Sequence, residues 1–235
     1  MLFFLAIFPP IFLILLIYKL DKHEKEPLEI IAKVFMLGCL TVIPVLLFEG
    51  IAKGIFDVGL VENILSATGS GLLGSDNIQL LLYVVFGIAI IEEYFKYLVL
   101  TRYAYKTEAF NEPMDGIVYG VVASLGFALI ENLMYVFSYD DGFYVAIGRM
   151  FSAIPAHALM GVIMGYYVGK AKFSPNNEKG LMLKGLIAAT ILHSVYDYFL
   201  FLGNGLGIFA FVSLIVSFFI AKKAIKESQD ASPFK

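Results

Sequence analysis

The sequence IAIIEEYFKYLVL, residues 88–100, decides the fold class, because it sets two glutamates and a lysine inside an apolar run. That run extends from about residue 78 to 101, long enough to cross a bilayer, since a membrane-spanning helix needs about 20 mostly apolar residues. Each ionisable group in such a run costs about 2.5–3.5 kcal/mol on insertion, so it normally faces a bundle interior or a water-filled cavity. The stretch therefore predicts a membrane helix with a polar inner face.

The rest of the chain has the composition of a membrane protein. Hydrophobic residues make up 60% of the 235 residues, only 16% are charged, and the mean hydropathy is +0.83. A soluble domain has about 45–50% apolar residues. Six further apolar runs lie near residues 2–18, 28–48, 114–137, 143–169, 181–202 and 206–221. We therefore predict an all-α fold, a polytopic membrane helix bundle with seven transmembrane helices in the lipid bilayer. The small net charge of -3 argues against a nucleic-acid partner.

Basic residues alternate between the loops. The first, third and fifth loops and the C-terminal tail carry clusters of Lys and Arg, whereas the second loop holds only Lys53 and the fourth and sixth hold none. Positive charge collects on cytoplasmic loops. We therefore expect the N-terminus outside and the C-terminus in the cytoplasm. On this topology residues 50–77 form the one long extracytoplasmic loop, which could contain a short interfacial helix.

The polar stretches between the runs are too short to form a core of their own, so we expect a single transmembrane domain over residues 1–235. Within it we expect N-terminal scaffold helices over residues 1–56 and a catalytic four-helix core over 78–202. The last span, 206–221, would lead into a cytoplasmic tail, 222–235.

Four consecutive runs carry the polar residues that lie at bilayer depth. They are Glu92, Glu93 and Lys96 in the third run, Glu131 and Asn132 in the fourth, Arg149 and His157 in the fifth, and His193 and Asp197 in the sixth. Residues four apart share one helix face, and small residues at that spacing mark close helix packing. Three ladders of this kind include Gly161, Gly165 and Gly169 after His157, Gly185 and Ala189 before His193, and Gly116, Gly120 and Ser124 leading to Glu131. The spacing predicts that these three helices point ionisable groups toward one interior.

Simpler structural roles exist for some of these residues. Glu92 and Lys96 could neutralise each other as an i,i+4 pair, whereas Glu93 has no such obvious partner, because neighbouring residues point about 100° apart. We therefore expect one of the two glutamates to be functional. His193 and Asp197 could form an inert pair. Arg149, nearer the outer end of its helix, is expected to be structural or to balance a carboxylate. Pro155 removes a backbone hydrogen bond and could open the fifth helix locally.

Carboxylates and imidazoles in a dry cavity are suited to activating water. Burial raises the pKa of a carboxyl group toward the working range of a general base. The same residues could instead bind zinc, since two His nitrogens and one Glu oxygen form a common catalytic zinc shell; that set would be Glu131, His157 and His193. Both alternatives lead to hydrolysis, glutamate-dependent or metal-dependent. The sequence contains no H-E-x-x-H, G-x-S-G or Gly-x-Gly-Asp motif of other intramembrane proteases.

The order of these motifs carries a resemblance. E-E-x-x-K at Glu92 to Lys96, F-x-x-x-E-N at Phe127 to Asn132, His157, and H-x-x-x-D at His193 to Asp197 resemble the PrsW family of membrane-embedded proteases, over about residues 85–200. This family is similar to the CAAX prenyl proteases, which have an arginine and a histidine where Lys96 and Glu131 stand. The resemblance implies a protease of the bacterial plasma membrane that makes the first cut in a membrane-anchored anti-sigma factor, in regulated proteolysis that releases a sigma factor.

The residues suggest the following roles. Glu92 or Glu93 would activate the attacking water. His157 and His193 would stabilise the oxyanion or bind a metal with Glu131. Asp197 would orient His193, and Asn132 could donate to the oxyanion. The alternatives are a proton-coupled transporter or channel, because chains of Glu, His and Asp also relay protons across membranes, a binding protein that keeps the protease scaffold without catalysis, and a CAAX-type prenyl peptidase.

Overall fold

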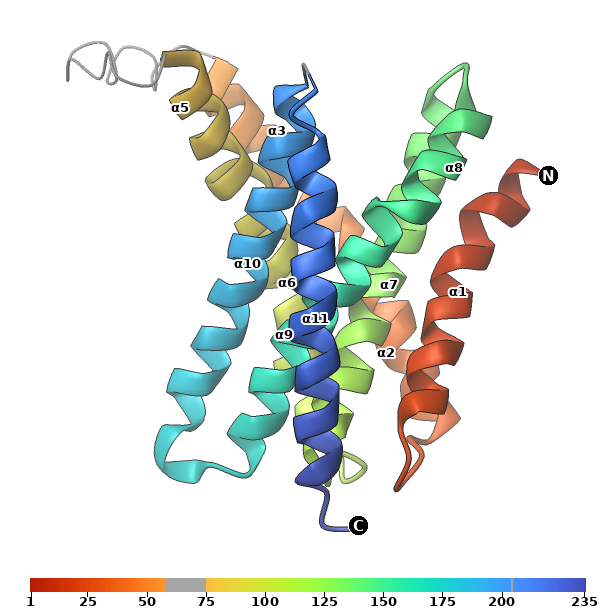
Figure 1. Cartoon of the computed structure of the whole chain (residues 1–235), viewed down its shortest axis with the longest axis vertical. Helices are drawn as coiled ribbons and strands as arrows, with labels where there is room; N and C mark the ends of the chain where they lie inside the picture. The colour runs from red at the N-terminus through yellow and green to blue at the C-terminus, as the bar shows by residue number, and fades with distance from the viewer. Residues whose placement is uncertain (58–74, 204) are drawn as a thin grey trace.

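The computed structural model describes residues 1–57, 75–203 and 205–235, and all regular structure in these residues is helical (Figure 1). The elements are α1 (Leu2–Leu20), α2 (Leu28–Leu40), α3 (Val42–Asp57), α5 (Ser75–Leu82), the π-helix η1 (Tyr83–Ala89), α6 (Ile90–Arg102), the 3-10 helix η2 (Ala104–Lys106), α7 (Pro113–Ser138), α8 (Gly142–Phe151), α9 (Ala153–Lys172), the 3-10 helix η3 (Pro175–Asn177), α10 (Glu178–Leu202) and α11 (Ile208–Asp230).

The prediction of an all-α bundle with seven spans is confirmed. Seven helical segments among the described residues are long and apolar enough to cross a membrane. Several of them extend further than expected, above all the second, which reaches Phe56 inside the predicted loop, and the last, which ends at Asp230 inside the predicted tail. The rest of that loop, residues 58–74, lies outside the described residues. The two termini lie at opposite ends of the bundle (Figure 1), as an odd number of spans requires; which end faces the cytoplasm stays a prediction.

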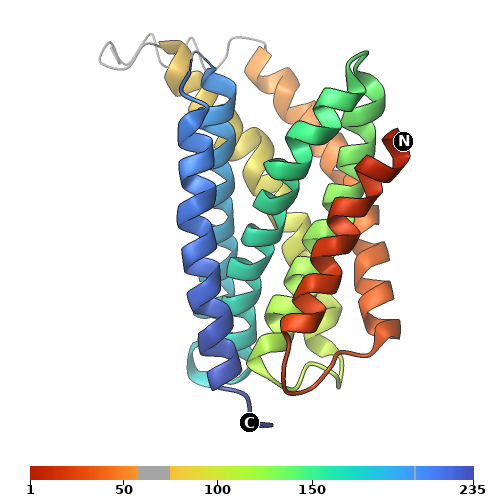
Figure 2. The same ribbon diagram turned by 45° about the vertical axis from the view of Figure 1, so that its right-hand side comes forward.

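Helix α7 forms the centre of the bundle, surrounded by α1, α2 and α9 (Figure 2). It is the most buried of the seven spans: 72% of its 18-residue apolar stretch lies inside the protein. The sequence fixes where α7 begins. Pro113 is its first residue, where a missing N–H costs nothing. The Asp115 carboxylate accepts the backbone N–H groups of Asn111 and Glu112 at 2.6 and 2.7 Å, which satisfies donors that the helix start leaves without partners.

Glycines bring α7 and α9 into direct backbone contact. A Cβ atom added to Gly161 would lie 2.8 Å from the carbonyl oxygen of Gly120 and 2.9 Å from Ser124 Oγ. Gly165 packs in the same way against Gly116. The two small-residue ladders predicted for these helices therefore face each other, which fixes the positions of the functional side chains that follow Ser124 and precede Gly161.

Three of the spans are interrupted at bilayer depth. The second changes from α2 to α3 at Thr41, three residues before Pro44, which cannot bond the carbonyl of Leu40. The third contains the π-helix η1. The fifth breaks at Ser152, where φ is −127° and ψ is −78°, close to Pro155, as the sequence suggests. Backbone of this kind is tolerated in membranes where it borders protein or a cavity.

Candidate active site

A cavity of about 680 Å³ lies among α3, η1, α6, α7, α8, α9 and α10. The three interruptions border this cavity. Its lining includes Val42, where α3 begins, Tyr83, where the π-helix begins, and Ala153, where α9 begins. Its polar lining includes six of the residues singled out from the sequence, Glu92, Glu131, Arg149, His157, His193 and Asp197. The structure therefore brings charged residues of four membrane spans to one space. The lining also includes Ser138 and Tyr139, where α7 ends, so the cavity extends to the end of the bundle that holds the N-terminus (Figure 1).

Lys96 is the central cation of the site. It is 1% exposed, and its Nζ lies 2.9 Å from Glu92 Oε2 and 2.8 Å from Glu93 Oε1. The expectation that Glu93 has no such partner is therefore wrong: the long lysine side chain reaches between residues i−4 and i−3 and serves both carboxylates. The ring of Phe127 packs against the ammonium, 4.2 Å from Nζ to the ring centroid, so the family motif residue Phe127 completes the enclosure of this charge.

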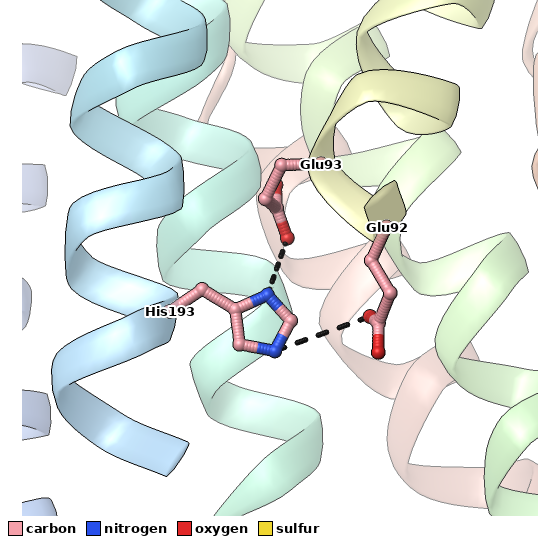
Figure 3. Close-up of side chains that lie close together, drawn as sticks. All are labelled: Glu92, Glu93 and His193. Atoms are coloured by element: carbon pink, nitrogen blue, oxygen red, sulfur yellow. Dashed lines mark hydrogen bonds and ion pairs between the residues drawn. The ribbon is translucent and has the colours of Figure 1, made fainter. Parts of the chain in front are cut away.

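His193 joins α10 to the two glutamates (Figure 3). Its Nδ1 lies 2.9 Å from Glu93 Oε1, and its Nε2 lies 3.2 Å from Asp197 Oδ2 and 4.0 Å from Glu92 Oε2. Asp197 is one helical turn beyond His193, so the i,i+4 spacing read from the sequence produces the contact directly. Both ring nitrogens of His193 therefore face carboxylates, and the imidazole is fixed in orientation.

His157 is held in a different way. Its Nδ1 lies 3.1 Å from Lys96 Nζ, and its Nε2 lies 3.0 Å from Glu131 Oε2. An ammonium can only donate, so Nδ1 accepts this bond, and a neutral imidazole then carries its hydrogen on Nε2. This assignment follows from the partners, since the hydrogen itself is not observed. The ring also packs edge-on against His193, with centroids 5.5 Å apart.

Arg149 balances a carboxylate, as expected. Its Nη2 bonds Glu131 Oε2, its Nε donates to Asn132 Oδ1 at 2.9 Å, and its guanidinium lies over the Tyr135 ring at 4.1 Å. Asn132 is fully buried and donates through Nδ2 to the carbonyl of Ala6 on α1, at 2.9 Å. Both ends of its amide are therefore engaged in joining α1, α7 and α8, which makes Asn132 a brace behind Glu131.

Sequence reasoning missed Glu49 of α3, which also lines the cavity. The signal was present, because Glu49 directly follows the apolar run 28–48. The predicted span ends at residue 48, which leaves Glu49 outside it, and residues 1–56 are predicted to be scaffold. In the structure the span continues to Phe56, so Glu49 lies inside it.

The charges of the site suit a divalent cation. Five carboxylates gather there, from Glu49, Glu92, Glu93, Glu131 and Asp197, against two permanent cations, Lys96 and Arg149. Ligand atoms of Glu92, Glu93 and His193 lie within 4.8 Å of one another, close enough for one ion, and Glu93 Oε2 is buried with no hydrogen-bond partner among the described residues. This donor set differs from the predicted Glu131, His157 and His193. Imidazole and carboxylate are the ligands that catalytic zinc uses in proteins.

Comparison with known proteins identifies the family. Residues 26–222 match the PrsW family of intramembrane metalloproteases. The chain is 30% identical over 223 residues to a protein named Protease PrsW from Geobacillus kaustophilus, covering 94% of this chain and 89% of the relative. It is 31% identical to that of Halalkalibacterium halodurans, covering 94% of each, and 33% identical to that of Bacillus subtilis, covering 83% and 80%. No solved structure matches the chain.

These matches favour the protease over the transporter, and with the seven apolar helices they make the chain a multi-pass protein of a bacterial cell membrane. A protease buried in a bilayer acts on membrane proteins. The buried cluster of glutamates and histidines is thus found in a member of a hydrolase family, and this chain belongs to the PrsW family of intramembrane metalloproteases.

Proposed function

We propose that this protease hydrolyses one peptide bond of a membrane-anchored anti-sigma factor, as the first cut in regulated intramembrane proteolysis. The cavity supports a cut near one membrane surface, because it extends from bilayer depth to the end of α7 at Ser138. On the topology predicted from the basic loops, this end is extracytoplasmic. A first cut there would leave the cytoplasmic part of the substrate attached to the membrane for later release.

Glu92 is the proposed general base. The observation that carries this choice is that Glu92 lines the cavity, whereas Glu93 is fully buried behind it and bonds Lys96 and His193. A base must lie within hydrogen-bond reach of the water it activates. Water in the cavity can reach the Glu92 carboxylate, whereas Glu93 lies behind the cavity wall.

His193 and its partners would hold the metal. A divalent ion, zinc by the chemistry of the donors, would make a bound water more acidic and polarise the substrate carbonyl. His193 and Glu93, two of the three residues whose ligand atoms lie close enough together for one ion, would bind it, which leaves Glu92 as the base. Asp197 orients the His193 ring, since its carboxylate lies 3.2 Å from Nε2. Such outer partners typically change metal affinity or activity 10–100-fold when removed.

His157 is suited to stabilising the oxyanion. The contact with Lys96 leaves the hydrogen of its imidazole on Nε2, which donates to Glu131 on the cavity wall and would be shared with the oxyanion when the substrate binds. A fixed donor in a site that excludes bulk water contributes most to stabilising charge that develops in the transition state. Arg149 also bonds Glu131, beside this donor. The preorganised cation pair, Lys96 and Arg149, therefore aligns His157 before the substrate arrives.

The experiment uses the purified full-length chain in liposomes with a single-span bacterial anti-sigma factor, and fragments are identified by mass spectrometry. We expect one cut by the wild type and a rate at least about 100-fold lower in Glu92→Gln, the size of a general-base contribution. Glu108→Gln is the matched control, because Glu108 is an exposed loop residue. Wild-type cleavage by Glu92→Gln would reject the proposed base. Cleavage of other single-span proteins but not of the anti-sigma factor would reject the proposed substrate.

A further inference from the structure

Glu49 lies on the wall of the cavity that α3 forms. It belongs to a stripe of α3 with Val42, Val45 and Leu46, which line the same cavity. One turn further along, Ala52 is 9% exposed, and it lies near the position where a Cβ atom on Gly87 of the π-helix would stand. Residues of α3 before and after Glu49 thus face the interior of the bundle, which directs the Glu49 side chain to the cavity.

Among the described residues, Glu49 has no hydrogen-bond or ion-pair partner. The other carboxylates of the cavity all have one: Glu92 and Glu93 share Lys96, Glu131 bonds Arg149, and Asp197 contacts His193. The charges that act most strongly on Glu49 are those of Glu92 and Glu131, which are also negative. The Glu49 carboxyl group therefore has no cation bonded to it, since Lys96 and Arg149 bond the other carboxyl groups of the site.

The helix that carries Glu49 separates the cavity from lipid. Its opposite face is apolar and exposed, with Ile43, Leu47, Phe48, Ile51 and Ile55 between 48 and 68% exposed. Toward the end of α3, Gln79 Nε2 donates to the carbonyl of Phe56 at 3.2 Å, and Phe56 packs on Tyr83. A membrane-anchored chain that reaches the catalytic residues across this wall passes Glu49.

We propose that Glu49 is a substrate-binding residue that determines specificity, pairing with a basic side chain, Lys or Arg, of the membrane-anchored substrate. The proposal rests on the proteolytic function proposed above. A lysine or arginine has an apolar stem, which can lie along Val45 and Leu46 while its charged end meets the carboxylate. Charge complementarity of this kind selects partners and fixes their register, so Glu49 would set which residue of the substrate lies beside Glu92.

The test measures binding. Three single-span peptides of one sequence carry Lys, Gln or Glu at one position near the extracytoplasmic end of the apolar segment, and the position is moved through four consecutive residues to cover a helical turn. Affinities are measured by fluorescence for the full-length chain in nanodiscs. We expect the wild type to bind the Lys peptide about 5–10-fold tighter than the Gln peptide at one or more positions, the effect of one partly buried charge pair.

Glu49→Gln should reduce this preference below about twofold and leave the affinity for the Gln peptide unchanged. Glu49→Lys should reverse it in favour of the Glu peptide, while Glu108→Gln should keep the wild-type preference. A wild type without preference at any of the four positions, or one that binds none of the peptides, would overturn the proposal, as would a preference retained in Glu49→Gln.

The binding readout separates this proposal from the proposed hydrolysis. Glu92→Gln should lose cleavage and keep the Lys preference, so a failure of the catalytic assignment leaves the binding result intact. In cleavage assays of a Lys-bearing peptide, Glu49→Gln should raise KM with little change in kcat, because uniform binding energy is lost. An unchanged KM would count against a role of Glu49 in binding.

Discussion

Substitution of Gly161 by alanine tests how the α7–α9 contact supports the site. The added Cβ would lie 2.8 Å from the carbonyl oxygen of Gly120, 2.9 Å from Ser124 Oγ and 2.9 Å from the Cα of Val121. Two of these three atoms are backbone, so they cannot rotate away. Ordinary contact begins near 3.4 Å, which means that the two helices must separate locally by about 0.6 Å.

The expected cost follows from two opposing effects. Overpacking of this kind destabilises by about 1–3 kcal/mol, while alanine is better than glycine in a helix by about 1 kcal/mol. We therefore expect Gly161→Ala to lower the free energy of unfolding by up to about 2 kcal/mol. Gly161 is one turn beyond His157, whose Nε2 lies 3.0 Å from Glu131 Oε2. Separation by about 0.6 Å would take this pair beyond hydrogen-bond distance. The cleavage rate should therefore fall more than the loss of folded protein alone would explain.

The matched control is Gly148→Ala in α8, where an added Cβ has nothing within 4 Å. The same chemical change there should raise the free energy of unfolding by about 0.5–1 kcal/mol. Both variants are compared with the wild type by steric trapping in bicelles, and the cleavage rate is measured on the same samples. Equal stability of Gly161→Ala and Gly148→Ala would refute the reasoning, because the α7–α9 contact would then not be close.

Two further predictions concern charges. Lys96→Met leaves Glu92 and Glu93 without their shared cation, so it should lower the free energy of unfolding by about 3–5 kcal/mol and the cleavage rate by at least about 100-fold. Lys96→Arg should recover part of both losses. A wild-type cleavage rate in Lys96→Met would contradict the role assigned to Lys96. In the α1–α2 loop, burial and then the Glu112 carboxyl raise the pKa of Asp21 to about 7. The folded chain thus keeps a proton that the unfolded chain releases near pH 4, so the free energy of unfolding should fall between about pH 4 and pH 7, by up to about 1.4 kcal/mol per pH unit. Asp21→Asn should remove this part of the pH dependence. Chemical unfolding of the wild type and of Asp21→Asn, measured across that pH range, checks this, and identical pH profiles for the two proteins would disprove the effect.

Much of the fold follows from local sequence patterns. The seven apolar runs predict the seven spans because a bilayer permits few other structures for the backbone. The small-residue ladders around Gly120 and Gly161 predict which helix faces meet, because both helices are regular there. Where the periodicity is interrupted, prediction is weaker. The π-helix Tyr83–Ala89 changes the residues per turn, and nothing in its sequence of apolar residues signals this.

The candidate site was predictable in part where partners lie on one helix. The His193–Asp197 and Glu92–Lys96 contacts follow from a spacing of four, whereas the Glu93–Lys96 contact, at a spacing of three, was not expected. Contacts between helices required the structure, since spacing says nothing about distance across the bundle: the Lys96–His157 contact, at 3.1 Å, joins residues 61 positions apart. Glu49 was missed for another reason. The end of an apolar run locates the end of a helix poorly, because a helix can carry one ionisable residue into a polar cavity.

The most direct test of the hydrolytic centre measures metal content and cleavage rate on the same purified samples. The account predicts that elemental mass spectrometry finds about one divalent ion per chain in the wild type, and that the same sample cleaves a single-span peptide. In His193→Gln both should be lost, and in Glu108→Gln both should be kept. A His193→Gln variant that cleaves the peptide at the wild-type rate would contradict the account, whatever its metal content.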